Sequence, residues 1–208
     1  MENSPENNKK EYGWKEYYER HAYLPHTKSL EKAVEEYVTG EKVALDIGAG
    51  NLRDTKYLLS QGFTVTALDS SPASTEIATA LHNPELVMIE KLIRDYEFPE
   101  NKFSLVNAQG ILFHLPIDRL ITNIDKIRKS LKEKGVFVTE LLGPHDDWNI
   151  SGTDKTFLTR EQLKELLKDF EIEYLDEYER DMTSDASEVT GTHELKHWHK
   201  FKIIAVKK

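Results

Sequence analysis

One pattern of strand, turn and helix near the start of the chain constrains its fold more than any other feature. Residues 43–47, VALDI, form a short and mostly apolar run of the kind that is buried in a parallel sheet, and glycines follow at once. The next segment places Leu52, Thr55 and Leu59 on one helical stripe, and a second such run follows at residues 64–68. This order predicts a strand-helix-strand unit in a parallel sheet.

The same alternation of patterns continues along the rest of the chain. Strands that alternate with helices favour a parallel sheet with helices on both faces, joined by right-handed crossovers. No helical pattern separates the last two strands, so the final strand is expected to run antiparallel to its neighbour. The further elements predicted are a helix from Ser29 to Gly40, a helix beginning at Pro72, strands at 86–90 and 103–108, a helix from Pro116 that Gly135 ends, a strand at 136–142, a helix capped by Thr159 and Gln162, and strands at 171–179 and 197–206.

The length and composition of the chain fit one globular domain. Its 208 residues are 38% apolar and 31% charged, which suits a single packed core. We expect residues 1–11 to form a disordered tail, because they carry too few apolar groups to offset the entropy of ordering. Residues 12–208 are expected to form the domain, with an aromatic N-terminal cap region at 12–40.

The same composition argues against several kinds of partner. No apolar run approaches the roughly 20 residues that cross a bilayer, and no secretory signal is visible, so we expect a cytoplasmic protein with no membrane partner. The absence of cysteine excludes disulfides, thiolate metal sites and cysteine nucleophiles. A net charge of -9 argues against a nucleic-acid partner, because nonspecific affinity for phosphates comes from Lys and Arg.

The turn after the first predicted strand carries the motif with most chemical meaning. Gly48 and Gly50 lack a Cβ, so the backbone there can turn sharply and lie against a ligand. Asp46 precedes this turn, and Asp69 ends the second strand. Open α/β sheets bind ligands at the carboxyl ends of their strands, where a carboxylate can accept both hydroxyls of an adenosine ribose. The turn and the two acids together predict a site for a nucleoside cofactor.

The spacing of this turn separates two classes of nucleoside cofactor. The dinucleotide pattern G-x-G-x-x-G needs a third glycine for close packing of helix and strand, and Arg53 stands at that position. A nicotinamide-dependent oxidoreductase on a similar sheet is therefore the less favoured hypothesis. The segment DIGAGN instead resembles motif I of the class I S-adenosylmethionine-dependent methyltransferases.

The resemblance covers most of the chain. Within this class, the sequence most resembles the bacterial methyltransferases of the tellurite-resistance type. The resemblance is carried by DIGAGN, ALDSSP, RDYEFPENKFSLVNAQ, GVFVTELLGPHDDW and KHWH. It implies an α/β fold with a Rossmann-like, seven-stranded, mostly parallel sheet whose last strand is antiparallel. It also implies S-adenosyl-L-methionine as cofactor and methyl transfer to a small-molecule acceptor. The family commonly has a glycine where Leu52 stands and an aspartate where Ser104 stands.

The resemblance implies cofactor contacts for residues near the carboxyl ends of the predicted strands. Two simpler roles stay open: Asp46 can tie down the glycine loop through its amides, and Asp69 can be a helix N-terminal charge. The implied cofactor-binding residues are Asp46, Gly48, Ala49 and Gly50 for the methionine portion, Asp69 and Ser70 for the ribose and its neighbouring edge, Ile93 and Arg94 beside the adenine, and Asn107 and Gln109 beside the sulfonium and the acceptor.

Histidines are the candidates for a general base, which methyl transfer needs only when the acceptor arrives protonated. His114 follows the fourth predicted strand, His145 follows the fifth, and His193, His197 and His199 stand near the end of the chain. In strand geometry His197 and His199 share one face. This pair can bind an anionic acceptor or a metal, or simply pair with nearby acids. We take His197, His199 and His114 as catalytic candidates and assign no metal site.

The aromatic residues from Tyr12 to Tyr23 have two alternative roles. They can fold over the cofactor as a lid, with Tyr17 or Tyr18 near the sulfonium in a cation–π contact, or they can pack against the sheet. We include Tyr18 among the cofactor-binding candidates, and Trp148 is a candidate for the acceptor pocket. A non-catalytic, cofactor-binding protein with a methyltransferase-like fold is a further hypothesis beside the enzyme.

Overall fold

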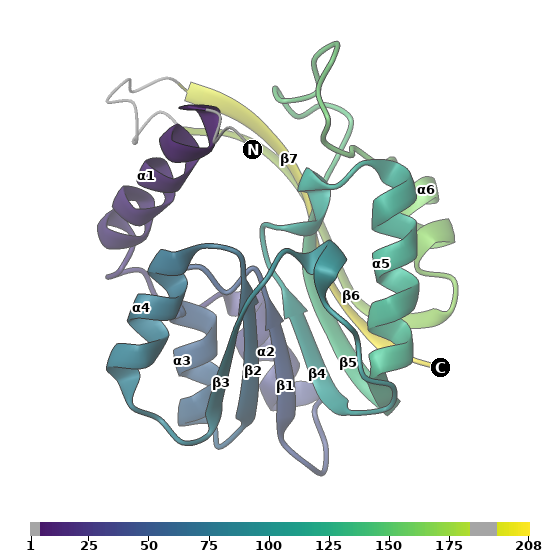
Figure 1. Cartoon of the computed structure of the whole chain (residues 1–208). Helices are drawn as coiled ribbons and strands as arrows, with labels where there is room; N and C mark the ends of the chain where they lie inside the picture. Colours follow the sequence, from purple (N-terminus) through teal and green to yellow (C-terminus); the bar gives the residue numbers. More distant parts are fainter. Residues whose placement is uncertain (1–4, 184–194) are drawn as a thin grey trace.

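The computed structural model describes residues 5–183 and 195–208, which form an open sheet with helices on both faces (Figure 1). The sheet has seven strands in the order β3-β2-β1-β4-β5-β7-β6. Neighbouring strands are parallel except at β7, which runs antiparallel to both β5 and β6. The Rossmann-like fold class is therefore confirmed, including the antiparallel last strand.

The elements follow the predicted alternation, and the ranges of the first four strands agree with the predicted ranges to within one residue. The strands are β1 (Val43–Ile47), β2 (Thr64–Asp69), β3 (Leu86–Glu90), β4 (Phe103–Ala108), β5 (Leu131–Leu142), β6 (Phe170–Thr183) and β7 (Leu195–Lys207). The helices are α1 (Pro5–Arg20), α2 (Lys28–Glu36), α3 (Arg53–Ser60), α4 (Pro72–Leu81), α5 (Ile117–Ser130) and α6 (Arg160–Leu166), with short 3-10 helices η1 (Ile93–Asp95) and η2 (Leu112–His114).

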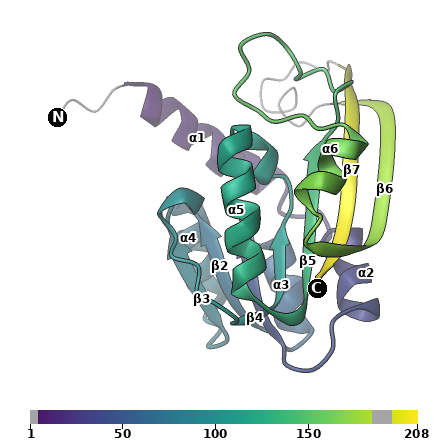
Figure 2. The ribbon, with the colours of Figure 1, turned by 90° about the vertical axis from the view of Figure 1, so that its right-hand side faces the viewer.

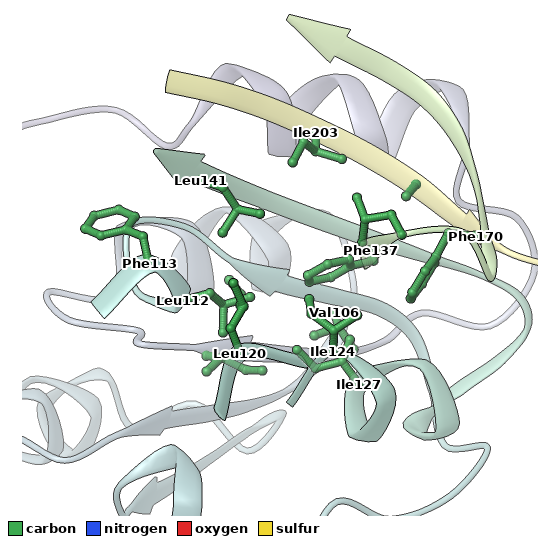
Figure 3. Packing of buried hydrophobic residues seen from close by; sticks show 14 of the residues in the cluster. Val106, Leu112, Phe113, Leu120, Ile124, Ile127, Phe137, Leu141, Phe170 and Ile203 are labelled. Atoms are coloured by element: carbon green, nitrogen blue, oxygen red, sulfur yellow. The ribbon is translucent and has the colours of Figure 1, made fainter. Parts of the chain in front are cut away.

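Apolar side chains attach helices to both faces of the sheet. On one face, Leu120, Ile124 and Ile127 of α5 pack against the central strands (Figure 3). Leu163 of α6 belongs to the same cluster. On the other face, α2 and α3 bury Leu30 and Leu58 against the same strands, and α4 packs beside them. All six residues of β4 are buried. Because helices cover both faces, the carboxyl ends of the strands are the edge at which side chains can meet a ligand.

Helix α5 ends earlier than the sequence predicts. Its apolar stripe predicts a helix that Gly135 ends, but α5 ends at Ser130 and β5 begins at Leu131. Leu131 pairs with Phe103 of β4, and Lys134 takes a left-handed φ of 59° before the strand continues. Leu131 is fully buried as a strand residue. The position of Leu131 in the apolar stripe indicates only that the residue is buried. The pattern alone therefore does not distinguish helix from strand here.

The N-terminal helix begins earlier than the sequence predicts. A disordered tail is predicted for residues 1–11, whereas α1 starts at Pro5 and runs to Arg20. Proline is favoured in the first turn of a helix, and the Glu and Lys residues that follow are good helix formers. Polar composition therefore does not exclude helix here, and the division of the chain into a tail and a domain stays a prediction.

The last two strands form a long antiparallel ribbon at one side of the sheet (Figure 2). β7 pairs with β5 only from Lys200 onward, so its first residues extend past β5 beside β6. Residues 184–194 connect the two strands and lie outside the described residues, and so does the candidate His193. None of the helices in the described ranges is long and apolar enough to cross a membrane.

Candidate active site

The strand order reverses between β1 and β4, which is where open α/β sheets bind ligands. Asp46 lies on β1 and pairs in register with Asn107 of β4. Asp69 ends β2, the neighbour of β1 on its other side. The structure therefore brings these three predicted cofactor residues to the carboxyl ends of three adjacent strands.

The glycine loop lies close against its surroundings. Gly48 and Gly50 have φ angles of 70° and 53°, in the left-handed region that favours glycine. A Cβ on Gly48 would lie 2.9 Å from the Cβ of Ile111, which is too close for any side chain. The amides of Gly48 and Ala49 both donate to the carbonyl of Leu68, across 2.7 and 3.2 Å. These two amides are therefore occupied by the end of β2 and are not free to bind a pyrophosphate.

The two positions that depart from the family pattern both have structural roles. Leu52 has a φ of 62° just before α3, a conformation that suits glycine, and its side chain is fully buried. Ser104 joins β4 to β1, because its hydroxyl accepts from the Val43 amide at 3.1 Å and donates to the Val43 carbonyl at 3.0 Å. The leucine thus combines a strained backbone with core packing, and the serine replaces a carboxylate by a neutral hydrogen-bonding group.

The carboxylate of Asp69 fixes the glycine loop to the end of β2. One of its oxygens accepts from the Gly50 amide at 2.8 Å, and the other accepts from the Ser71 amide at 2.8 Å. Each carboxylate oxygen has a second lone pair, so these two bonds leave acceptor capacity for a ligand. Asp69 is half-buried. The ribose role itself stays a prediction.

Asp46 belongs to a buried network of polar groups. Its carboxylate accepts from the Thr55 hydroxyl at 2.5 Å and from the Asn107 amide at 2.8 Å. The same Asn107 amide nitrogen lies 3.2 Å from one carboxylate oxygen of Asp54, and the other oxygen of Asp54 accepts from the Thr27 amide. The network joins β1, β4, α3 and the segment before α2. Asp46 therefore ties the base of the glycine loop to α3, and a direct contact with a cofactor stays a prediction.

The electrostatics of this network favour a positively charged ligand. Burial, together with the negative charge of Asp54, raises the pKa of the Asp46 carboxyl. Two carboxylates determine the orientation of the Asn107 amide, because only its NH2 group can donate to both. The amide oxygen of Asn107 is then a buried acceptor without a hydrogen-bond partner among the described residues. A buried acceptor beside two acids is satisfied by a cationic donor such as an ammonium group.

Tyr18 of α1 lies over the glycine loop. Its exposed fraction is only 7%, and a Cβ placed on Gly50 would lie 3.2 Å from its ring. Burial and the neighbouring carboxylate of Asp69 raise the pKa of the Tyr18 phenol. This placement is the one expected of a lid, although contact between Tyr18 and a cofactor stays a prediction.

Polar contacts hold the N-terminal segment across the carboxyl ends of the strands. Lys15 of α1 pairs with Glu76 of α4 across 3.3 Å on the surface. The side-chain amide of Asn51, next to the glycine loop, donates to the His21 carbonyl at 2.9 Å. The residues after α1 are thus attached to the loop that follows β1, which places the cap region over the crevice.

The remaining cofactor candidates lie after the carboxyl ends of β2, β3 and β4. Ser70 is exposed directly after β2, and η1 carries the half-buried Ile93 and the exposed Arg94. Gln109 follows β4, and its amide nitrogen lies 3.2 Å from the Ser29 hydroxyl of α2. All four are at the edge where the resemblance places the adenine and the acceptor, and their contacts with a ligand stay predictions.

His114 belongs to an aromatic group that follows β4 and β5. Its ring centroid lies 6.4 Å from that of Trp148, which lies 4.9 Å from the ring of Trp198 in an edge-to-face arrangement. Burial, with a smaller effect from Lys155, lowers the pKa of His114 to about 4. The imidazole is therefore neutral at neutral pH and has a lone pair that can accept a proton.

Two lysines of β7 flank Trp198. The Lys196 ammonium lies 3.4 Å from the ring centroid, and that of Lys200 lies 4.1 Å from it. Lys196 pairs with the buried Asp146, and Lys200 pairs with Glu140 across 2.8 Å. Each cation is thus matched by a carboxylate, so the wall around Trp198 combines aromatic surface with paired charges.

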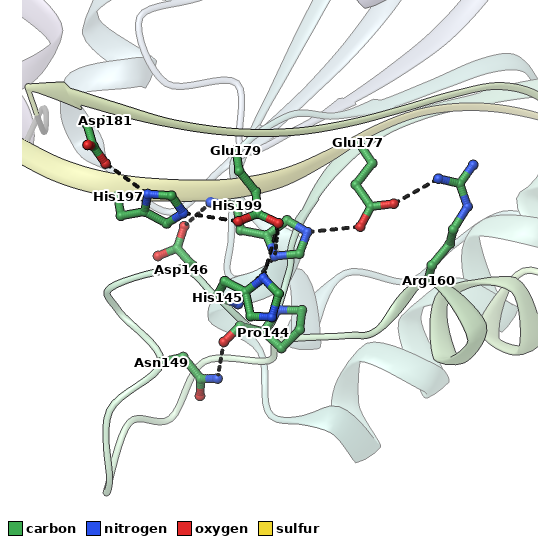
Figure 4. A network of polar contacts seen from close by, with 10 residues as sticks. All are labelled: Pro144, His145, Asp146, Asn149, Arg160, Glu177, Glu179, Asp181, His197 and His199. Carbon is green, nitrogen blue, oxygen red and sulfur yellow. Dashed lines mark hydrogen bonds and ion pairs between the residues drawn. The ribbon is translucent and has the colours of Figure 1, made fainter.

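His197 and His199 lie together, as the strand pattern predicts, but among acids of β6 (Figure 4). His199 has an exposed fraction of 2%, and its Nε2 lies 3.1 Å from Glu177. His197 lies 2.8 Å from Asp181 and 3.2 Å from Glu179, and these hydrogen bonds raise the pKa of His197. Of the alternatives considered for this pair, the structure shows the pairing of both histidines with nearby acids. A catalytic role for the pair stays a prediction.

Some members of these networks were not among the predicted site residues. Asp54 stands in the first turn of α3, where an acid normally needs no explanation beyond the helix dipole. Glu177 and Glu179 alternate on β6 with the same spacing as His197 and His199 on β7. That spacing is a signal in the sequence, but only the register of the two strands shows that the acids face the histidines.

Comparison with known proteins finds similar sequences for the central part of the chain. A methyltransferase domain family matches residues 44–135, from β1 into β5. An uncharacterised methyltransferase of Synechocystis sp. is 31% identical over 109 residues, which are 52% of this chain and 50% of that protein. The match thus spans half the length of this curated relative. The central part of the chain is thus similar to methyltransferase domains.

Solved structures extend the similarity to nearly the whole described chain. TehB from Haemophilus influenzae, of the tellurite-resistance type, has a TM-score of 0.74 at 16% identity, covering 94% of this chain and 67% of that one. The 1,6-didemethyltoxoflavin-N1-methyltransferase of Burkholderia thailandensis, with S-adenosylhomocysteine bound, has a TM-score of 0.63 at 20% identity, covering 100% and 92%. The fold of this chain is that of the S-adenosylmethionine-dependent methyltransferases.

Proposed function

We propose that this protein binds S-adenosylmethionine in the crevice between β1 and β4 and transfers its methyl group to a small-molecule acceptor. One observation carries the proposal: the crevice is lined by acids and by a buried acceptor, the Asn107 amide oxygen, that lacks a partner among the described residues. S-adenosylmethionine has an ammonium group and a positively charged sulfur. An acidic crevice with an unpaired acceptor suits both charges.

The residues present fit this cofactor at three places. Asp69 retains lone pairs for the ribose hydroxyls, Asn107 offers its amide oxygen to the ammonium group, and Tyr18 covers the glycine loop between them. The similarity to methyltransferase domains and the neighbour with bound S-adenosylhomocysteine support the same cofactor. A dinucleotide fits less well, because the Gly48 and Ala49 amides that would face its pyrophosphate already donate to β2.

Catalysis would consist mainly of alignment. The bound cofactor supplies a methyl group on a cationic sulfur, which an acceptor atom can displace in line. Within the chain, the acidic crevice orients the cofactor and the cap region covers it. The neutral imidazole of His114, next to Trp148, can take a proton from an acceptor that arrives protonated. His114 is a candidate for this base because of its position beside Trp148, and His197 and His199, which acids of β6 hold in place, are the other candidates.

Calorimetric titration of the full chain with S-adenosylhomocysteine tests the cofactor. We expect one equivalent to bind with a dissociation constant of about 1 to 100 μM, and NADH to give no heat under the same conditions. Absence of binding would overturn the proposal, and binding of NADH alone would favour the oxidoreductase hypothesis. The acceptor is then sought by following S-adenosylhomocysteine release with oxyanions, thiols and heterocyclic amines. Cofactor binding without turnover of any acceptor would favour the non-catalytic hypothesis.

A further inference from the structure

A cluster of histidines and acids lies on the antiparallel ribbon and includes His197 and His199, the secondary candidates for a general base. It consists of His145 in the loop after β5, Glu179 on β6 and His199 on β7, with Glu177 and His197 beside them (Figure 4). We refer to His145, Glu179 and His199 as the clasp. The three residues come from separate elements, and their imidazole and carboxylate groups converge on one point.

The geometry of the clasp suits a metal ion. One ligand atom from each of the three residues lies within 4.8 Å of the other two. The Glu179 carboxylate lies 3.1 Å from Nδ1 of His145 and 3.7 Å from Nδ1 of His199. Ligands at about 2.0 to 2.2 Å from a tetrahedral zinc ion are about 3.5 Å apart, so small side-chain rotations bring all three into range.

A second layer of contacts holds His199 in the orientation that a metal ligand needs. Its Nε2 lies 3.1 Å from Glu177, and Glu177 is itself fixed by Arg160 across 2.8 Å. A carboxylate that accepts from one imidazole nitrogen leaves the other nitrogen with a free lone pair, which is the usual arrangement behind a metal-bound histidine. The backbone amide of His145 donates to Nδ1 of His199 across a long 3.3 Å, so an ion bound at this nitrogen would replace that hydrogen bond.

The backbone also makes room for the His199 ring. A Cβ on Gly143 would overlap that ring, so only glycine allows the imidazole to lie against the loop after β5. The amide of Gly143 donates to the His199 carbonyl at 2.7 Å, which fixes the loop beside β7. The side chain of His199 is 3% exposed, whereas those of His145 and Glu179 are 66% and 41% exposed. One ligand is thus preorganised, and two are accessible to an ion from solution.

We propose that the clasp binds a divalent transition-metal ion of the zinc type, through His145, His199 and Glu179, with a water molecule in the remaining position. Two imidazoles and one carboxylate are a donor set that Zn²⁺ prefers, whereas Ca²⁺ and Mg²⁺ prefer oxygen donors. In the sequence a metal is only one of three alternatives for the pair of His197 and His199, because Glu179 and His145 join His199 only through the register of β6 and the path of the loop.

The bound ion would link β6 and β7 to the residues around Trp198, which lie near the candidate general base His114. The loop that supplies His145 continues into Asp146, which pairs with Lys196, and into Trp148, which packs on Trp198. Fixing His145 to β6 and β7 therefore fixes the loop whose other side chains surround Trp198. The inference concerns this metal site and does not depend on the proposed methyl transfer.

Metal titration of the chelator-treated full chain tests the clasp. Zn²⁺ binding is followed by calorimetry, and Co²⁺ binding by the visible bands of a tetrahedral complex. We expect one equivalent of either ion to bind, with affinity at least about tenfold weaker in His145→Asn and in Glu179→Gln. The matched control is His82→Asn, which changes an exposed-helix C-cap histidine in the left-handed region, where asparagine is tolerated, and should bind as the wild type does.

The outcomes of this titration decide the proposal in either direction. No saturable binding by the wild-type chain overturns it, and so does binding that His145→Asn and Glu179→Gln leave unchanged, which would place the ion elsewhere. A second readout is hydrogen exchange: the loop from 143 to 150 should become more protected with Zn²⁺ in the wild type and in His82→Asn, but not in His145→Asn. Because these measurements use no cofactor, a failure of S-adenosylhomocysteine binding leaves their result intact.

Discussion

The amide nitrogen of Asn107 lies 2.8 Å from the carboxylate of Asp46 and thereby joins β4 to β1 at the point where the strand order reverses. The second hydrogen of the same amide is directed at Asp54, 3.2 Å away. One neutral side chain thus donates to two acids in the interior, while its buried oxygen has no hydrogen-bond partner among the described residues.

Replacing this amide by a third carboxyl group should be costly. Asn107→Asp places another acid between Asp46 and Asp54, and we expect a loss of about 3 kcal/mol of unfolding free energy at neutral pH. Urea denaturation measures the loss. The control is Asn83→Asp, an exposed change that retains the oxygen accepting from the Glu85 amide and should change stability by less than about 0.5 kcal/mol. The deficit should shrink at pH 5, where protonation relieves the repulsion. Equal stability of Asn107→Asp and the wild type would contradict this account of the network.

Neutralising Asp69 should weaken cofactor binding. Asp69→Asn keeps one acceptor oxygen but loses the second, so we expect affinity for S-adenosylhomocysteine to fall by about 10- to 100-fold. Asp118→Asn, an exposed change of the same charge at the start of α5, should leave affinity unchanged. Calorimetry with adenosine as a second ligand separates ribose binding from support of the loop. A ribose role requires both ligands to lose affinity in similar ratio, and unchanged affinity for both would remove that role.

At Leu52, the left-handed backbone should make a glycine variant more stable than an alanine variant, which is the reverse of the usual order. Leu52→Ala removes a fully buried side chain and should cost about 3 kcal/mol, and Leu52→Gly removes the same packing but relieves the strain of a φ of 62°. We therefore expect the glycine variant to be about 1 kcal/mol more stable than the alanine variant. Thermal or urea unfolding of the pair measures the difference. An alanine variant that is the more stable of the two would show that the position carries no strain.

His114 should make the protein less stable as the pH falls. Its folded pKa is about 4 and its ordinary value is 6.5, so between these values the unfolded chain binds a proton that the native protein does not. The stabilisation is fully present above pH 6.5 and is lost as the pH falls toward 4, by up to about 3 kcal/mol. His114→Gln removes this proton-linked loss. Denaturation curves at pH 7, 6 and 5 should therefore show a shallower decline for the variant, and parallel declines would rule the effect out.

The strands of the fold were predictable because buried parallel strands are marked by their apolar runs. β3 and β4 occupy the predicted residues, and the antiparallel direction of β7 follows from the lack of a helical pattern before it. The end of α5 was not predictable in the same way. Leu131 fits the apolar stripe of the helix and the core of the sheet equally well, and its pairing with Phe103 decides between them.

The candidate site was predictable in position more than in detail. Glycines after one strand and an acid after the next locate the crevice, because parallel strands end at a common edge. The contact of Asn107 with Asp46 joins residues 61 positions apart and depends on the register of β1 and β4. The acids around His199 likewise depend on the register of β6, which shifts between Ile172 and Tyr174. Local patterns carry no information about such registers.

The close approach of Gly143 to the ring of His199 ties the fates of two positions that lie far apart in the chain. Any relative in which the first position has gained a side chain must have given up an imidazole at the second, or must have moved the whole loop that carries His145. Among relatives in which the loop keeps its position, Gly143 and His199 should therefore be conserved together or replaced together.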